Sequence, residues 1–130
     1  MYSLYFDGAS KGNPGPSGYG GVFYDEEMRI IYKYSGICEG KQTNNFAEYT
    51  ALVRGLEYAL NTNVKELKVY GDSKLVIEQF NGNWKLKSKN LKDLYSQAQI
   101  LQKKFDKITC QHVRREFNST ADSLANQFIK

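Results

Sequence analysis

The periodicity of the sequence changes near residue 43, and this change limits the folds that the chain can adopt. Before it, segments rich in aromatic and β-branched residues predict strands at 1–7, 19–24 and 29–38, and "DEE" at 25–27 indicates a hairpin turn. After it, "TNNFAEYTALVRGLEYAL" places alanine and leucine at helical spacing, with Thr43 or Asn44 as the N-cap. The chain therefore begins as an antiparallel meander and continues into a helix.

The remaining segments alternate between strand and helix patterns. We predict a strand at 64–71, a short helix in "DSKLVIEQF", a helix at about 90–104, a strand in "KITCQHV" and a last helix at 119–129. The order βββαβααβα predicts an α/β fold, a mixed sheet with helices on its faces. The first and fourth strands should pair in parallel through a right-handed crossover. No repeat or linker interrupts residues 1–130, which predicts a single domain.

Composition restricts the compartment and the partners. No apolar run is long enough for a membrane span, and "MYSLYFDGAS" lacks the features of a signal peptide, so we expect a cytoplasmic protein without a membrane partner. The spacing of Cys38 and Cys110 does not suit zinc, and reduced thiols are expected. The net charge of +4 is compatible with a polyanionic partner, and lysines crowd residues 85–107.

Two aspartates end strands that should lie side by side. Asp7 ends the first strand and leads into "GASKGNPGPSGYGG", and Asp72 follows the fourth strand. In open α/β sheets, ligands bind at the carboxyl ends of such strands. A purely structural role is the alternative for Asp72, because an aspartate also suits the N-cap position of the next helix.

Two further carboxylates occupy helix positions that should face the sheet. Glu48 shares a helix face with Ala51 and Leu52 and has no arginine or lysine one turn away. Asp122 lies beside Ala121, although an acid there also complements a helix dipole. If these four acids converge, their repulsion requires cations. Oxygen ligands without thiolate or imidazole favour Mg²⁺ or Mn²⁺, and a pair of such ions suits phosphodiester chemistry.

Four motifs together resemble type 1 ribonuclease H: "DGASKGNPGPSGYG", "TNNFAEYTAL", "GDSKLVIEQF" and "NSTADSLAN". The resemblance covers residues 5–128 and implies a five-stranded mixed sheet of order 3-2-1-4-5 flanked by helices. It implies hydrolysis of the RNA strand of RNA/DNA hybrids to 5′-phosphate and 3′-hydroxyl ends. The family's metal-binding acids match Asp7, Glu48, Asp72 and Asp122, with two Mg²⁺ ions, or Mn²⁺ as a substitute. Glu48 is also expected at the ribose 2′-hydroxyl.

Substrate-binding residues are implied in the same way. Asn13, Asn44 and Asn45 match residues that contact the minor groove of the hybrid, and Thr43 matches a threonine that binds a DNA-strand phosphate. Simpler readings remain, because an asparagine before Pro14 suits a turn and Asn44 suits a cap.

The sequence departs from many bacterial members after the third acid. Only "NGNWKLKSKN" stands where those members have a long basic protrusion. Trp84 with Lys85, Lys87 and Lys89 would form a shortened grip on the DNA strand, through stacking and charge. The sequence is equally compatible with Trp84 packing in the hydrophobic core.

A second departure concerns the histidine that assists many members from a flexible loop. The single histidine, His112, stands at a strand end without glycine nearby, so we expect it to be fixed there. Arg115 is then the better candidate for a cation near the scissile phosphate. The implied fold also puts Cys38 and Cys110 on opposite sheet edges, which excludes a disulfide between them.

Two other functions are compatible with part of the sequence. A module that binds hybrids or double-stranded RNA without catalysis would lack one or more of the four acids, and all four are present. A relative that cuts branched or double-stranded DNA would not need the "TNN" stretch. The expected enzyme is a monomeric endoribonuclease whose partner is an RNA/DNA hybrid, and cleavage of double-stranded RNA stays open.

Overall fold

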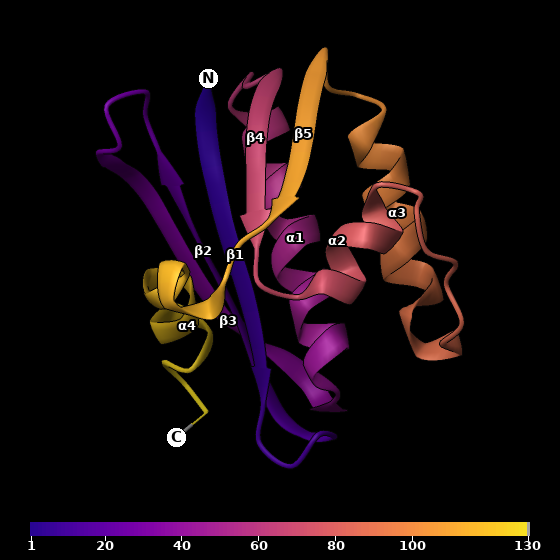
Figure 1. Ribbon diagram of the computed structural model, residues 1–130. Coiled ribbons are helices and arrows are strands. Elements are labelled where there is room, and N and C mark those ends of the chain that lie inside the picture. Colours follow the sequence, from indigo (N-terminus) through magenta and orange to yellow (C-terminus); the bar gives the residue numbers. More distant parts are fainter. Residues whose placement is uncertain (130) are drawn as a thin grey trace.

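Five strands form one mixed sheet of order β3-β2-β1-β4-β5, which confirms the predicted order (Figure 1). The structure is a computed structural model that describes residues 1–129. The strands are β1 (Tyr2–Ser10), β2 (Gly15–Tyr24), β3 (Ile30–Gln42), β4 (Glu66–Gly71) and β5 (Lys107–His112). β1, β2 and β3 form the antiparallel meander, and β4 pairs in parallel with both β1 and β5.

The helices cover the two faces of the sheet unequally. The helices α1 (Asn44–Asn61), α2 (Lys74–Phe80) and α3 (Lys92–Gln102) lie on one face, and α4 (Ser119–Ala125) lies on the other (Figure 1). Short 3₁₀ turns, η1 (Lys89–Leu91) and η2 (Arg115–Phe117), precede α3 and α4. Within the described residues, no helix has the length and apolar character needed to span a bilayer.

The main core lies between the central strands and α1. Side chains alternate along a strand, so Leu4 and Phe6 of β1 point to one face and are fully buried there. The apolar stripe of α1 meets them with Leu52 and Leu56, which are also fully buried. Burial of each such side chain contributes about 1.5–3 kcal/mol, which makes this contact the main support of the central strands.

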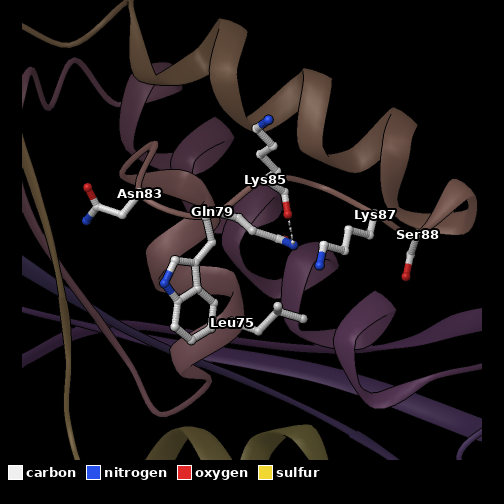
Figure 2. A pocket seen from close by; sticks show the side chains of 7 residues that line it. Leu75, Gln79, Asn83, Lys85, Lys87 and Ser88 are labelled. Atoms are coloured by element: carbon white, nitrogen blue, oxygen red, sulfur yellow. Dashed lines mark hydrogen bonds between the residues drawn. The ribbon is translucent and has the colours of Figure 1, made fainter.

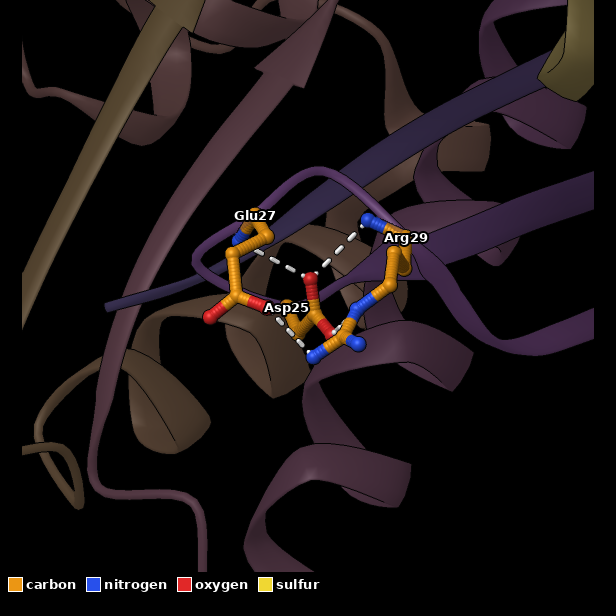
Figure 3. Close-up of polar contacts among 3 residues, drawn as sticks. All are labelled: Asp25, Glu27 and Arg29. Atoms are coloured by element: carbon orange, nitrogen blue, oxygen red, sulfur yellow. Dashed lines mark hydrogen bonds and ion pairs between the residues drawn. The ribbon is translucent and has the colours of Figure 1, made fainter.

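The hairpin turn predicted at "DEE" is present and is held by Asp25. Its carboxylate accepts hydrogen bonds from the backbone N–H groups of Glu27 and Arg29, each at 2.9 Å (Figure 3). The Arg29 guanidinium also pairs with Asp25 and Glu27. These contacts close the chain between β2 and β3.

The glycine-rich stretch after Asp7 is mostly strand, although the predicted strands end at residue 7 and begin again only at residue 19. β1 continues to Ser10 and β2 starts at Gly15, so the turn itself is confined to residues 11–14. Gly18 and Gly20 of β2 lie beneath α4: a Cβ on Gly20 would lie 2.5 Å from the Cβ of Leu124. Bare backbone is therefore needed where the helix packs on the strand.

Several element ends differ from the prediction. The last helix ends at Ala125 instead of residue 129, because the Asn126 side chain donates to the Asp122 carbonyl and caps the helix there. η1 replaces the predicted start of the third helix, and β4 starts two residues late, at Glu66. Cys38 on β3 and Cys110 on β5 occupy opposite edges of the sheet, and both thiols are free, as predicted.

The backbone of α1 approaches the sheet closely at Gly8. A Cβ at this position would lie 2.3 Å from both the carbonyl carbon of Ala47 and the backbone nitrogen of Glu48. Real Cβ contacts are never so short, so any side chain here would push α1 away from β1.

We expect Gly8→Ala to lower the free energy of unfolding by about 3 kcal/mol, because the added methyl group meets helix backbone that cannot rotate away. The matched control is Gly82→Ala, whose Cβ would meet nothing within 4 Å and whose cost comes only from its φ of +83°, about 1 kcal/mol. Urea denaturation measures both. Equal losses in the two variants would contradict the packing described here.

Candidate active site

Two strands part at the place where the predicted aspartates lie. The parallel pairing of β1 with β4 ends at Phe6 and Gly71, and Asp7 and Asp72 are the next residues. Asp72 is not the N-cap of α2, because the Ser73 hydroxyl accepts the hydrogen bond from the Val76 N–H. The Asp72 carboxylate is therefore free to face Asp7.

Glu48 reaches the same place from α1. It is buried, and the N–H of Gly8 donates to its Oε1 at 2.7 Å. Its Oε2 is buried without a hydrogen-bond partner among residues 1–129. One oxygen each from Asp7, Glu48 and Asp72 lie within 4.8 Å of one another. Three of the four predicted acids thus form a tight cluster.

Asp122 approaches from the opposite face of the sheet, on α4. It lines the same pocket as the other three acids, and this carboxylate pocket has a volume of about 430 Å³. Four separate elements, β1, α1, the β4–α2 connection and α4, therefore supply the acids. The pocket is lined by Asp7, Gly8, Ala9, Asn44, Asn45, Glu48, Asp72, Ser73, Arg115, Asp122 and Asn126.

The cluster favours protons on two of its acids. Burial raises the pKa of Asp7 to about 7, and the carboxylates of Asp72 and Asp122 add to the increase. Burial also raises the pKa of Glu48 well above its usual range, and Asp7 and Asp72 raise it further. A hydrogen bond between the two side chains lowers the pKa of Asp7 and raises that of Glu48, and a hydrogen bond from Gly8 lowers both pKa values slightly.

The donor set fits a divalent cation. Every nearby ligand is a carboxylate oxygen, and hard oxygen ligands suit Mg²⁺ or Mn²⁺. The unpartnered Oε2 of Glu48 is a buried acceptor that a cation would satisfy. A bound cation would also remove the repulsion that raises the pKa of Asp7.

Asn118 ties three of these elements together and was missed by sequence reasoning. It is buried, and its Nδ2 donates to the Phe6 carbonyl at 2.9 Å and to Oδ2 of Asp72 at 3.3 Å. Its own carbonyl accepts from the N–H of Asp122 at 3.0 Å. The only signal was its place at the start of "NSTADSLAN", where an asparagine also reads as a helix cap.

The predicted substrate-binding residues at the start of α1 lie together. The Thr43 hydroxyl accepts from the Phe46 N–H at 3.1 Å, so Thr43 is the N-cap. Asn44 accepts from the Ser10 N–H at 2.8 Å, and Asn13 accepts from the Asn44 N–H at 2.9 Å. Asn45 lines the carboxylate pocket together with Asn44. The 11–14 turn is thereby attached to the rim of the pocket.

The two candidates for an assisting cation are separated. His112 ends β5, and its Nε2 lies 3.2 Å from the backbone carbonyl oxygen of Asp72. It does not line the carboxylate pocket, whereas Arg115 at the start of η2 does. This arrangement agrees with the expectation of a histidine fixed at the strand end.

A second hollow of about 450 Å³ lies beside the short segment between α2 and η1. Leu75 and Gln79 of α2 line it together with Lys85 and Lys87, and the Lys85 ammonium points away from Leu75 (Figure 2). Trp84 lines this hollow and is 43% exposed, so it is not a core residue.

Buried polar contacts hold the wall of this hollow in place. Gln79 accepts from the Tyr49 hydroxyl at 2.6 Å and donates to the Lys85 carbonyl at 3.4 Å. The Lys74 ammonium lies 6.0 Å from the centre of the Trp84 ring, within cation–π range. Lys89 begins η1 and does not line the hollow.

Comparison with known proteins identifies close relatives. A family profile described as "Reverse transcriptase-like" matches residues 5–128. A bifunctional protein of Mycobacterium tuberculosis is 45% identical over 120 residues, which make up 92% of this chain and 33% of that protein. The chain therefore spans a third of the length of this relative.

Two further relatives have solved structures. The ribonuclease HI of Halobacterium salinarum is 40% identical over 96% of this chain and 62% of its own length. The crystal structure of the ribonuclease H1 from this archaeon aligns with a TM-score of 0.92 at 38% identity, over 97% of this chain and 95% of that one. LC11 ribonuclease H1, crystallised with an RNA/DNA hybrid, aligns with a TM-score of 0.90 at 34% identity, over 98% and 95% of the two chains.

We expect Asp7→Asn to stabilise the metal-free protein, and to do so more as pH rises from 4 to 7. The folded Asp7 keeps its proton up to a pKa of about 7, whereas the unfolded residue releases it near 3.8. Asp7 therefore lowers the stability of the unsubstituted protein over this window, by at most about 1.4 kcal/mol per pH unit, and the asparagine variant lacks this contribution and keeps only that of Glu48.

The measurement is thermal unfolding in EDTA across this pH range, repeated with Mg²⁺ at pH 8. Mg²⁺ should raise the Tm of the unsubstituted protein more than that of the variant. A stability difference between the two proteins that stays constant with pH would refute the repulsion described for this cluster.

Proposed function

This chain belongs to the type 1 ribonuclease H family, and on that basis we propose that it hydrolyses the RNA strand of RNA/DNA hybrids, leaving 5′-phosphate and 3′-hydroxyl ends. The observation that carries the proposal is the convergence of Asp7, Glu48 and Asp72 within 4.8 Å, with Asp122 in the same pocket. The LC11 enzyme, which aligns along nearly the whole chain, was crystallised with such a hybrid.

The four carboxylates would hold two Mg²⁺ ions, with Mn²⁺ as a substitute. When bound, such ions activate the attacking water and neutralise charge on the leaving 3′-oxygen. The residues themselves contribute placement: Gly8 fixes one oxygen of Glu48, and Asn118 fixes one oxygen of Asp72. A rigid set of acids needs little rearrangement during the reaction, which favours catalysis.

Recognition of RNA would depend on the rim of the carboxylate pocket. We assign Glu48 to the ribose 2′-hydroxyl, the group that distinguishes RNA from DNA. Asn13, Asn44 and Asn45 would face the minor groove. This role is supported by the hydrogen bonds that attach Asn13 to Asn44 and Asn44 to Ser10, since they fix the position of the turn relative to β1 and α1.

The DNA strand would contact two places, the N-terminus of α1 and the segment around Trp84. Thr43, at the helix N-terminus, suits a phosphate, because backbone N–H groups there favour anions. The half-exposed Trp84 with Lys85 and Lys87 would add stacking and charge, and Lys89 would extend this basic segment.

We also propose that the protein acts as a monomer in the cytoplasm. One chain supplies all four carboxylates, so catalysis requires no second subunit. Two free cysteines on opposite edges of the sheet suit a reducing compartment.

The proposal is tested with labelled RNA/DNA, RNA/RNA and DNA/DNA duplexes in Mg²⁺ and in Mn²⁺. We expect cleavage of the RNA strand of the hybrid and loss of at least about 10³-fold of the rate in Asp7→Asn, because one ligand of the cluster is lost. The same variant should keep its affinity for the hybrid in EDTA.

Each other outcome points to a different function. Hybrid binding without cleavage under every metal condition would identify a binding module, and cleavage of DNA/DNA duplexes alone would identify a DNA nuclease. Cleavage of both the hybrid and the RNA/RNA duplex would show a broader specificity at the same site.

We expect Arg115→Ala to lower kcat for the hybrid by about 10²-fold, because it removes a cation from the pocket wall. His112→Ala should keep most of the activity, because His112 contacts the Asp72 backbone and lies outside the pocket lining. Steady-state kinetics with saturating Mg²⁺ measures both variants. A His112→Ala enzyme slowed a hundredfold, with unchanged metal affinity, would reverse the two assignments.

A further inference from the structure

The sheet face that carries α4 is only partly covered and presents aromatic side chains. Figure 1 shows α4 alone on this face, with the first parts of β1, β4 and β5 left open. Strand register places Tyr5 of β1 beside Tyr70 of β4, and Ser3 beside Lys68. These residues alternate with the buried Leu4 and Phe6, so they lie on the face away from α1.

Three tyrosines on this face form one cluster. The rings of Tyr5 and Tyr70 stack with centroids 4.8 Å apart and planes at 23°, and Tyr24 meets Tyr5 edge-on at 5.4 Å. All three are partly exposed. None of their hydroxyls has a hydrogen-bond partner within residues 1–129, whereas Tyr34 and Tyr49 both donate to buried acceptors.

A cation and a further aromatic ring border the cluster. Phe117 of η2 is 63% exposed, and the Arg114 guanidinium lies 5.9 Å from its ring centre. A hollow of about 160 Å³ joins Phe117 to Tyr5 and Tyr24. We call this surface the open-face patch; it consists of Tyr5, Tyr24, Tyr70, Lys68, Arg114 and Phe117.

The two charged members of the open-face patch, Lys68 and Arg114, are both cations. Lys68 is exposed, and it forms no ion pair among the described residues. Lys107 faces the same side, next to Glu66 in the strand register. Glu116 is paired with Arg114 at 3.2 Å, Asp25 follows Tyr24, and Asp7 and Asp72 lie two residues beyond Tyr5 and Tyr70.

We propose that the open-face patch binds single-stranded nucleic acid. Exposed aromatic rings beside lysine and arginine are the features that hold unpaired bases and their phosphates. A duplex would not use them, because its bases are already stacked and paired. The patch therefore fits a single strand and not the hybrid that we assign to the carboxylate pocket.

The open-face patch lies close enough to the carboxylate pocket for one nucleic acid to contact both. Tyr5 and Tyr70 precede Asp7 and Asp72 by two residues on the same two strands, about 7 Å along each strand. A single-stranded extension of a bound hybrid would reach the patch from the carboxylate pocket after passing η2. This consequence rests on the proposed ribonuclease function, whereas binding of a free single strand does not.

The direct test is the anisotropy of labelled single-stranded oligo-dT and oligo-U with the unsubstituted protein in EDTA and low salt. Tyr70→Val should weaken binding by about 5- to 100-fold, the range for loss of one stacked base, and Lys68→Glu should also weaken it. Tyr70→Phe should bind normally, because it keeps the ring. The oligo-dT and oligo-U arms show whether DNA or RNA is preferred.

Matched controls separate the patch from general effects. Tyr32→Val removes another exposed tyrosine, one that stacks on Tyr58 of α1 and so lies on the other face. Lys104→Glu makes the same charge change outside the patch. Both should bind within about twofold of the unsubstituted protein, and thermal melts should show that each variant is folded.

Three outcomes would overturn the proposal. One is equal binding by Tyr70→Val and the unsubstituted protein. Another is binding that is lost in Trp84→Ala and kept in Tyr70→Val, which would assign it to the hollow beside Trp84. The third is no oligonucleotide binding together with self-association that Tyr70→Val abolishes, which would identify an interface between copies of the chain.

A kinetic test links the patch to the active site. A hybrid with a single-stranded extension should show a lower KM than the blunt hybrid, by about 3- to 10-fold, and Tyr70→Val should remove this difference without changing kcat. If neither hybrid is cleaved, the ribonuclease proposal fails while the anisotropy result still decides the binding proposal. If both are cleaved with equal KM, the extension does not use the patch and this link is wrong.

Discussion

The contact between the backbone of Gly8 and the beginning of α1 is the constraint on which the site depends. Because Gly8 has no side chain, α1 comes close enough for Glu48 to reach the gap between β1 and β4. The apolar packing of Leu52 and Leu56 on Leu4 and Phe6 holds the helix at this distance. The same few residues thus support both the core and the position of a buried acid.

The carboxylates of the site repel one another, and the packing of the core must compensate for this loss of stability. Burial and neighbouring carboxylates raise the pKa values of Asp7 and Glu48. The metal-free folded protein is therefore least stable at a pH at which both acids are charged. Functional sites commonly reduce stability in this way, and the core compensates for it. The acids that weaken the metal-free protein are the ones that a cation would bind, so metal affinity and instability have one origin.

Periodicity and strand ends predicted the elements, the parallel pairing of β1 with β4 and the hypothesis that four acids converge, because these depend on local properties. The complete strand order was implied by the resemblance to a known family. The start of β2 at Gly15 was missed, because the packing of α4 on Gly18 cannot be seen in the local sequence pattern. Asn118 was missed because its partners, Phe6 and Asp72, are 112 and 46 residues away. The end of α4 at Ala125 was missed because a side-chain cap from Asn126 outweighs the continuing helical pattern.

The late position of Asn118 and Asp122 in the chain affects the order in which the site forms during synthesis. A ribosome delivers β1 to β4 and α1 first, and domains tend to fold as their segments emerge. Three acids can then already meet, but the amide that joins the Phe6 carbonyl to Asp72 and the fourth acid arrive with α4. A nascent chain would therefore carry an incomplete cluster of carboxylates until α4 docks on the sheet.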